Sequence, residues 1–171
     1  MGIFDWLFGK KKIDEKSKKK NTSNLLNQFT KQEQSDLRVY AFIRCLLEMM
    51  KADGAMDPGE MQFMAQFSEE EQKKLSKPYD VSSKLGKFIW GNPYESVSTN
   101  RKNLISVIKT YPKKELVNFL EKIIVMAVAD RDLDNRESQY LIALCADIFD
   151  VLKAEAIDIA SPIGSPYTGW Q

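Results

Sequence analysis

An internal repeat constrains this chain most: a shift of 77 residues aligns two long blocks of its sequence. Apolar positions fall on apolar positions, and three acidic positions fall on acidic ones. The matched pairs include Phe42 with Phe119, Leu46 with Ile123, Met49 with Met126, Asp53 with Asp130, Asp57 with Asp134, Glu60 with Glu137, Met64 with Leu141, and Phe67 with Leu144. Because self-similarity at a fixed spacing is typical of duplicated structural units, we expect two related helical hairpins packed about a pseudo-twofold axis.

Each hairpin is predicted to be two helices joined by a short acidic turn. The central helices are the strongly apolar stretches 35–53 and 116–129. Gly54 follows the first of them as the left-handed residue that commonly ends a helix. Asp57 then supplies an N-cap, and Glu60 completes a capping box.

Further helix boundaries are expected at four places. Ser68 and Glu71 form another capping box that would open a short helix, Asp80 would cap a helix that Gly91 ends, and Pro112 separates two more. No stretch alternates at period two, so no sheet is expected. The predicted fold class is therefore all-α, a duplicated helical-hairpin bundle of about seven to eight helices.

Charge divides the chain into segments. The net charge is +1, but residues 1–20 hold seven lysines against three acids. We expect an amphipathic apolar head at 1–12, a basic linker at 13–22, a helical domain at 23–160 and a flexible tail at 161–171. The basic run lacks interleaved aromatic residues or arginine, which argues against nucleic acid as a partner.

The composition argues against most catalytic chemistry. There is no histidine, so the commonest general base and zinc ligand is missing. The two cysteines, Cys45 and Cys145, fall in apolar helical patterns and are expected to be buried, reduced thiols. No apolar run reaches the ~20 residues of a membrane span. We therefore expect a cytoplasmic protein that is not an enzyme.

The acidic turns have two possible roles. Asp57, Glu60, Asp134 and Glu137 are explained as helix caps, but Asp53 and Asp130 follow helix C-termini, where the dipole disfavours a carboxylate. The alternative is a divalent cation site, for which the candidate ligands are Asp53, Asp57, Glu60, Asp130, Asp132, Asp134 and Glu137. Asp130, Asp132 and Asp134 alternate like the first half of an EF-hand loop, although the twelfth position is Leu141. Because all donors are hard oxygens, the ion would be Ca²⁺ or Mg²⁺.

The doubled pattern of helix, Ala-Asp-Gly, Met-Asp-x-x-Glu and helix resembles the TerB-like superfamily over roughly residues 30–155. This superfamily includes tellurite-resistance TerB proteins and the N-terminal domain of a membrane-bound DnaJ-like co-chaperone. The resemblance implies an all-α duplicated fold, an acidic surface proposed to bind divalent metal, and a binding role in bacterial stress response or defence. The motif positions are Asp53, Asp57, Glu60, Asp130, Asp134 and Glu137. Arg131 departs from the pattern, since it replaces the glycine of the first copy.

The N-terminal arm is predicted to bind a membrane surface. Apolar side chains would enter the headgroup region while lysines meet anionic lipid, each contributing roughly 1 kcal/mol. The candidate residues are Ile3, Phe4, Trp6, Leu7, Phe8, Lys10, Lys11 and Lys12. The protein would then be cytoplasmic and peripheral to the inner membrane. The alternative is that the head docks onto this or another protein.

The tail offers a second candidate contact. Tyr167 and Trp170 lie in a stretch rich in proline and glycine, and exposed aromatic residues there favour a protein partner. The expected function is a non-enzymatic adaptor. Two alternatives stay open: a structural subunit of a larger assembly docked through head and tail, and a carboxylate-metal hydrolase.

Overall fold

The computed structural model describes residues 25–52, 54, 57–92, 97–127 and 135–150, and these residues form six helices with no strand. The helices are α3 (Lys31–Met50), α4 (Pro58–Gln72), α5 (Lys84–Trp90), α6 (Val97–Ile108), α7 (Lys113–Ala127) and α8 (Asn135–Phe149). The all-α prediction is confirmed. The number of helices in the described ranges is slightly below the expected seven to eight.

One expected helix boundary is wrong. Ser68 and Glu71 do not open a new helix, because α4 continues through both, and the Ser68 hydroxyl contacts Met64 Sδ one turn back at 3.5 Å. Both side chains are buried inside the bundle. The N-cap of α5 also differs from the expectation: it is Ser83, whereas the Asp80 side chain accepts from the Ser82 backbone at 2.8 Å.

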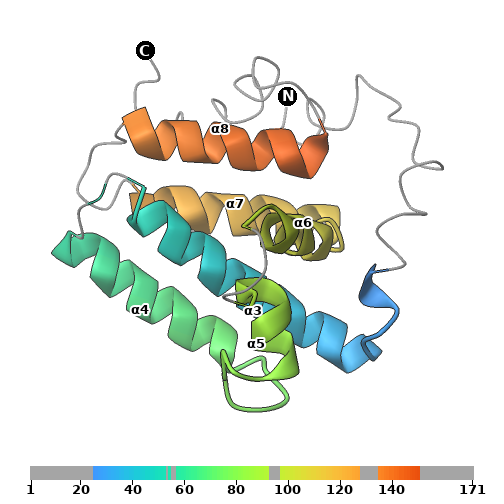
Figure 1. The fold of residues 1–171 in the computed structure, drawn as a ribbon. Coiled ribbons are helices and arrows are strands. Elements are labelled where there is room, and N and C mark those ends of the chain that lie inside the picture. The colour runs from blue at the N-terminus through green and yellow to red at the C-terminus, as the bar shows by residue number, and fades with distance from the viewer. Residues whose placement is uncertain (1–24, 53, 55–56, 93–96, 128–134, 151–171) are drawn as a thin grey trace.

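The repeat is confirmed by the helix bounds. The ends of α3 and α7, at Met50 and Ala127, are 77 residues apart, as are both ends of α4 and α8. The rings of Phe42 and Phe119, which are equivalent in the repeat, contact each other with centroids 5.5 Å apart. A side chain that touches its own equivalent must lie at the symmetry axis, so the pseudo-twofold passes between α3 and α7. Figure 1 shows these two helices crossing in the centre, with α8 above and α4 below.

The core fills the space between the paired hairpins. Its largest fully buried side chains are Leu37, Leu46, Met49, Ile89, Leu104, Ile108, Leu120, Ile123, Ile124, Met126, Leu141 and Leu144. They come from α3, α5, α6, α7 and α8, whereas α4 supplies none of them. Most of the buried apolar area that stabilises the domain therefore comes from the other five helices.

The symmetry breaks where α5 and α6 pack on α3. Leu37 and Ala41 of α3 are fully buried. Their equivalents in α7 are Lys114 and Asn118, and both are exposed. The sequence of each copy thus matches its place: α3 is covered on several sides, and the outer face of α7 is polar because it faces solvent.

Candidate functional site

The first acidic turn is a set of helix caps. After α3 ends, Gly54 adopts φ +84°, the left-handed region expected of it. Asp57 is the N-cap of α4: its Oδ1 accepts from the Gly59 backbone at 2.6 Å, and Glu60 Oε2 accepts from the Asp57 backbone at 3.1 Å. The predicted capping box is confirmed. Helix α3 ends at Met50, three residues before the expected end at residue 53. Gly54 therefore lies four residues beyond the helix instead of directly after it.

The second acidic turn precedes α8 in the sequence. Asp53, Asp130, Asp132 and Asp134 lie outside the described residues, but Glu137 is described and is 3% exposed. Its repeat equivalent, Glu60, is also 3% exposed. Both helices therefore bury a glutamate at their third position.

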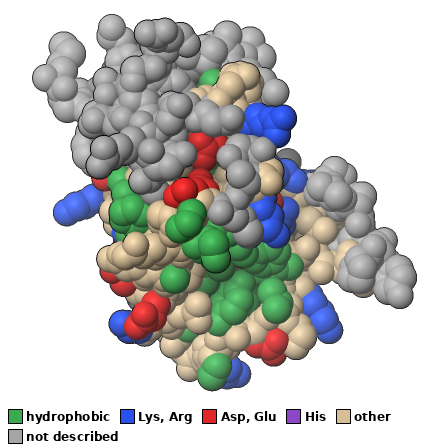
Figure 2. All heavy atoms as spheres, turned by 90° about the vertical axis from the view of Figure 1, so that its left-hand side faces the viewer, with side chains coloured by type: hydrophobic (Ala, Val, Ile, Leu, Met, Phe, Trp, Pro, Cys, Tyr) green, Lys and Arg blue, Asp and Glu red, His purple; other side chains and the backbone are tan. Residues whose placement is uncertain are grey.

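The fold brings the first turn and the start of α8 to the same end of the molecule. A Cβ placed on Gly54 would lie 3.9 Å from Nη1 of Arg136, so the start of α8 lies beside the first turn. In Figure 1 the C-terminal ends of α3 and α7 and the N-terminal ends of α4 and α8 all lie on the left. Figure 2 looks onto this end, where hydrophobic side chains gather beside acidic and basic ones.

The described acids alone do not make a metal centre. Within the described ranges no three histidine, cysteine, aspartate or glutamate side chains group closely enough to hold an ion. One oxygen each of Asp57 and Glu60 is occupied by a cap bond. A cation would therefore need carboxylates from Asp53, Asp130 or Asp132, whose hard oxygens suit Ca²⁺ or Mg²⁺.

Comparison with known families decides the assignment. The profile of the family described as "Tellurite resistance protein TerB" matches residues 40–161, well over half of the chain. The chain belongs to the TerB family. No curated protein and no solved structure matches it. The matched region spans both acidic turns and ends beyond α8, so the duplicated hairpin is the TerB domain.

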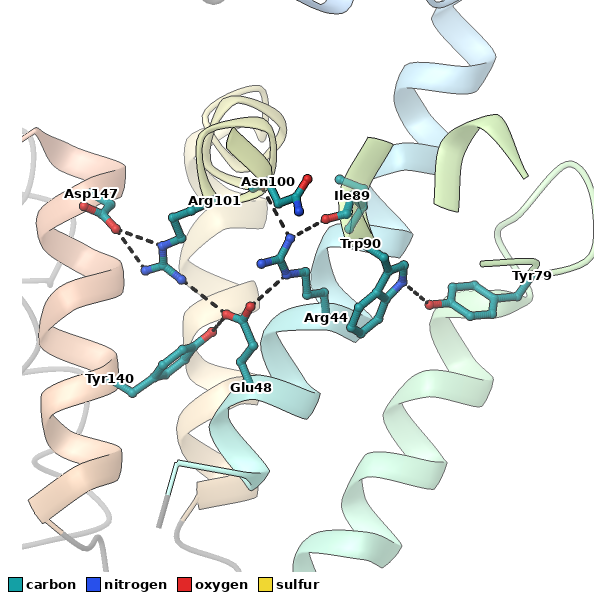
Figure 3. A network of polar contacts seen from close by, with 9 residues as sticks. All are labelled: Arg44, Glu48, Tyr79, Ile89, Trp90, Asn100, Arg101, Tyr140 and Asp147. Atoms are coloured by element: carbon teal, nitrogen blue, oxygen red, sulfur yellow. Dashed lines mark hydrogen bonds and ion pairs between the residues drawn. The ribbon is translucent and has the colours of Figure 1, made fainter. Parts of the chain in front are cut away.

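A polar network in this TerB domain was not predicted from its sequence. The Glu48 carboxylate of α3 accepts from Arg44 at 2.7 Å, from Arg101 of α6 at 3.2 Å, and from the Tyr140 hydroxyl of α8 at 2.8 Å. Arg101 also pairs with Asp147 at 2.9 Å. Figure 3 shows these side chains converging between α3, α6 and α8. Glu48 is therefore the common acceptor that joins three helices of the TerB domain.

The network continues toward α5. The Arg44 guanidinium donates to the backbone oxygens of Ile89 and Asn100, and it lies 6.0 Å from the Trp90 ring. Trp90 in turn donates to the Tyr79 hydroxyl at 2.9 Å. Arg44 is only 7% exposed, so its charge is compensated by fixed partners rather than by water.

The sequence signal for this network was the polar stripe of α3. Arg44 and Glu48 are the two charged residues between Val39 and Met50 of α3, and their spacing of four residues allows an ion pair. Their contacts to Arg101 and Tyr140 join residues 53 and 92 positions apart. No local pattern identifies such partners, because only the packing of α3 against α6 and α8 brings them together.

Burial also suppresses the acidity of nearby groups. It raises the pKa of the Cys45 and Cys145 thiols to about 12, with Glu48 adding to the effect at Cys45. Burial likewise raises the pKa of Tyr140 well above its ordinary value. Both thiols are free and buried, as expected from their apolar helical positions. The TerB domain thus holds them as neutral packing groups.

Other expected contact residues lie outside the described ranges. This applies to the apolar head and lysines of residues 3–12, and to Tyr167 and Trp170 of the tail. Among the helices that are described, none has the length and hydropathy to cross a membrane.

Proposed function

We propose that this TerB protein is a non-enzymatic binding module that uses the end bearing both acidic turns to bind a divalent cation and a protein partner. The observation that carries the proposal is the proximity of Gly54 to Arg136, by which the first turn and the start of α8 share one end. Because the first turn and the start of α8 lie together, one ligand would reach carboxylates of both sequence motifs. In keeping with the family's description, the setting would be bacterial stress response or defence.

A binding role suits the chemistry of this end better than catalysis does. The chain contains no histidine, the commonest general base. The described carboxylates Asp57, Glu60 and Glu137 lie at helix starts, and carboxylate oxygens are ligands that hard cations prefer. The proposed role is thus to hold a hard cation or a basic surface.

Calorimetric titration with Ca²⁺ and with Mg²⁺ tests the cation. Asp57→Asn is the sharpest variant, because asparagine caps a helix about as well as aspartate but carries no charge. We expect binding heat in the parent, weaker binding in Asp57→Asn and Asp130→Asn, and no change in Glu69→Gln, whose side chain is 73% exposed on α4. The metal-free melting temperature of Asp57→Asn should stay unchanged. Absence of heat in the parent at millimolar metal would remove the cation from the proposal.

The N-terminal arm would attach this module to the cytoplasmic face of the inner membrane. Seven lysines follow or flank the apolar head, a combination that gives reversible binding to anionic lipid. Flotation with vesicles containing anionic lipid should recover the full chain and not a chain lacking residues 1–20. A chain that floats equally well without the arm would contradict this attachment.

A further inference from the structure

The two outer helices are matched in length but not in how they are held. Helix α8 buries five hydrophobic side chains, Leu141, Ile142, Leu144, Cys145 and Ile148. Helix α4, its repeat equivalent, buries one hydrophobic residue, Phe67, together with Glu60, Ser68 and Glu71. Burial of apolar area is the main force that holds a helix on a bundle. The attachment of α4 is therefore the weaker of the two.

Helix α4 also carries apolar residues that are not fully buried. Met61 of α4 is 52% exposed, and Phe63 and Met64 are only partly buried. Leu141, the repeat equivalent of Met64, is fully buried. At this pair of equivalent positions α4 therefore keeps a partly exposed methionine where α8 has a fully buried leucine.

A lysine of α7 adds polar contacts to α4, which has fewer buried hydrophobic residues than α8. Lys122 Nζ donates to Glu71 Oε1 at 3.1 Å and lies 3.8 Å from Glu70 Oε2. The same ammonium lies 5.6 Å from the Phe67 ring of α4 and 5.7 Å from the Phe42 ring of α3. The Lys122 side chain is 23% exposed and that of Glu71 is 12% exposed, so this pair is partly removed from water and stronger than a surface pair.

We propose that α4 is a releasable helix, held on the bundle by Lys122 and its contacts with Glu71 and Phe67. In its released state the rest of the domain stays folded, because α4 supplies none of the largest fully buried side chains of the core. Release uncovers the rings of Phe42 and Phe67 and turns an outer polar face into an apolar surface. This inference goes beyond the proposed cation and membrane binding and depends on neither.

Native-state hydrogen exchange of the full chain tests it. Backbone amides 77 residues apart in α4 and α8 form matched pairs, so protection factors can be compared at equivalent helix positions. We expect α4 amides to be at least ten-fold less protected than their partners in α8, since local opening gives lower protection than global unfolding. Equal protection in the matched pairs would overturn the proposal.

Lys122→Met tests the role of the lysine, because methionine keeps much of the side chain and removes the charge. Protection in α4 should fall by a further factor of about ten while that in α8 is unchanged. Lys73→Met is the matched control: Lys73 pairs with Glu69 on the same helix, but both side chains are about 70% exposed, and such pairs contribute little. If Lys122→Met lowers protection equally in α4 and α8, the lysine stabilises the whole domain and the proposal fails.

Discussion

Two glycines have nearly the same positive φ but lie in very different surroundings. Gly54 has φ +84° and Gly91 has φ +85°. A Cβ on Gly91 would overlap the side chain of Asn100, whereas a Cβ on Gly54 would have only Arg136 Nη1 nearby, at 3.9 Å. Comparing alanine variants at the two positions shows how much the overlap with Asn100 adds to the cost of a positive φ.

We expect Gly91→Ala to lower the free energy of unfolding by more than about 3 kcal/mol, because strain and overlap add. Gly54→Ala should cost only about 1 kcal/mol, the strain alone. Urea denaturation of both variants measures the difference. Equal costs at the two positions would show that Asn100 moves aside freely.

The buried thiols predict a loss of stability at high pH. Their pKa rises from 9.0 to about 12 on folding, so the folded state keeps protons that the unfolded state releases. This stabilisation is complete below pH 9 and is lost as the pH rises from 9 toward 12, at about 1.4 kcal/mol per thiol per pH unit. Urea midpoints between pH 8 and 11 should fall accordingly.

Cys45→Ala serves as the control for this pH dependence. Removing one of the two thiols should make the fall in stability between pH 9 and 10 about half as steep. A slope that stays the same in the variant would assign the alkaline loss to other groups, such as the buried Tyr140 hydroxyl, whose pKa is also raised.

At the scale of helices, the sequence predicted how α4 starts but not how α3 is connected. The cap of α4 depends on Asp57 and Glu60, which are three residues apart, so local pattern sufficed. Helix α3 begins at Lys31, earlier than expected, because Thr30 and Glu33 form a capping box. That signal is also local. The partners of Glu48 on α6 and α8, by contrast, are set by helix packing and have no local signal.

Glu48→Ala tests the importance of that junction. The variant leaves the Arg44 side chain, 9% exposed, without its carboxylate, and breaking such a pair costs about 3 kcal/mol. The comparison is Glu69→Ala, which removes an exposed pair and should change stability by less than about 0.5 kcal/mol. Chemical denaturation of both variants is the measurement, and a Glu48 variant as stable as the Glu69 variant would contradict the assigned role.

At the scale of the whole molecule, the repeat predicted the architecture. The shift of 77 residues implied the pseudo-twofold and the pairing of α4 with α8. The repeat alone did not indicate that α5 and α6 pack on α3. The polar residues Lys114 and Asn118, at the positions equivalent to Leu37 and Ala41, were the sequence evidence for a difference between the two central helices. The acids at positions 53, 130, 132 and 134 stay predictions, because they lie outside the described residues.

The contact at the axis provides a test of the pairing of the two hairpins. Phe42→Ala and Phe119→Ala should each cost about 3–5 kcal/mol. Because the two rings touch, the double variant should lose about 1 kcal/mol less than the sum of the single variants. A double-mutant cycle by urea denaturation measures this coupling, and strictly additive costs would place the rings out of contact.

The polar outer face of α7 has a consequence for how this domain can have diverged after its duplication. A chain built from two copies of the second hairpin would place Lys114 and Asn118 at the buried positions that Leu37 and Ala41 now occupy. A chain built from two first hairpins would instead turn those apolar residues toward water. The two halves are therefore no longer interchangeable. Replacing the sequence of one hairpin by that of the other would no longer give a folded domain.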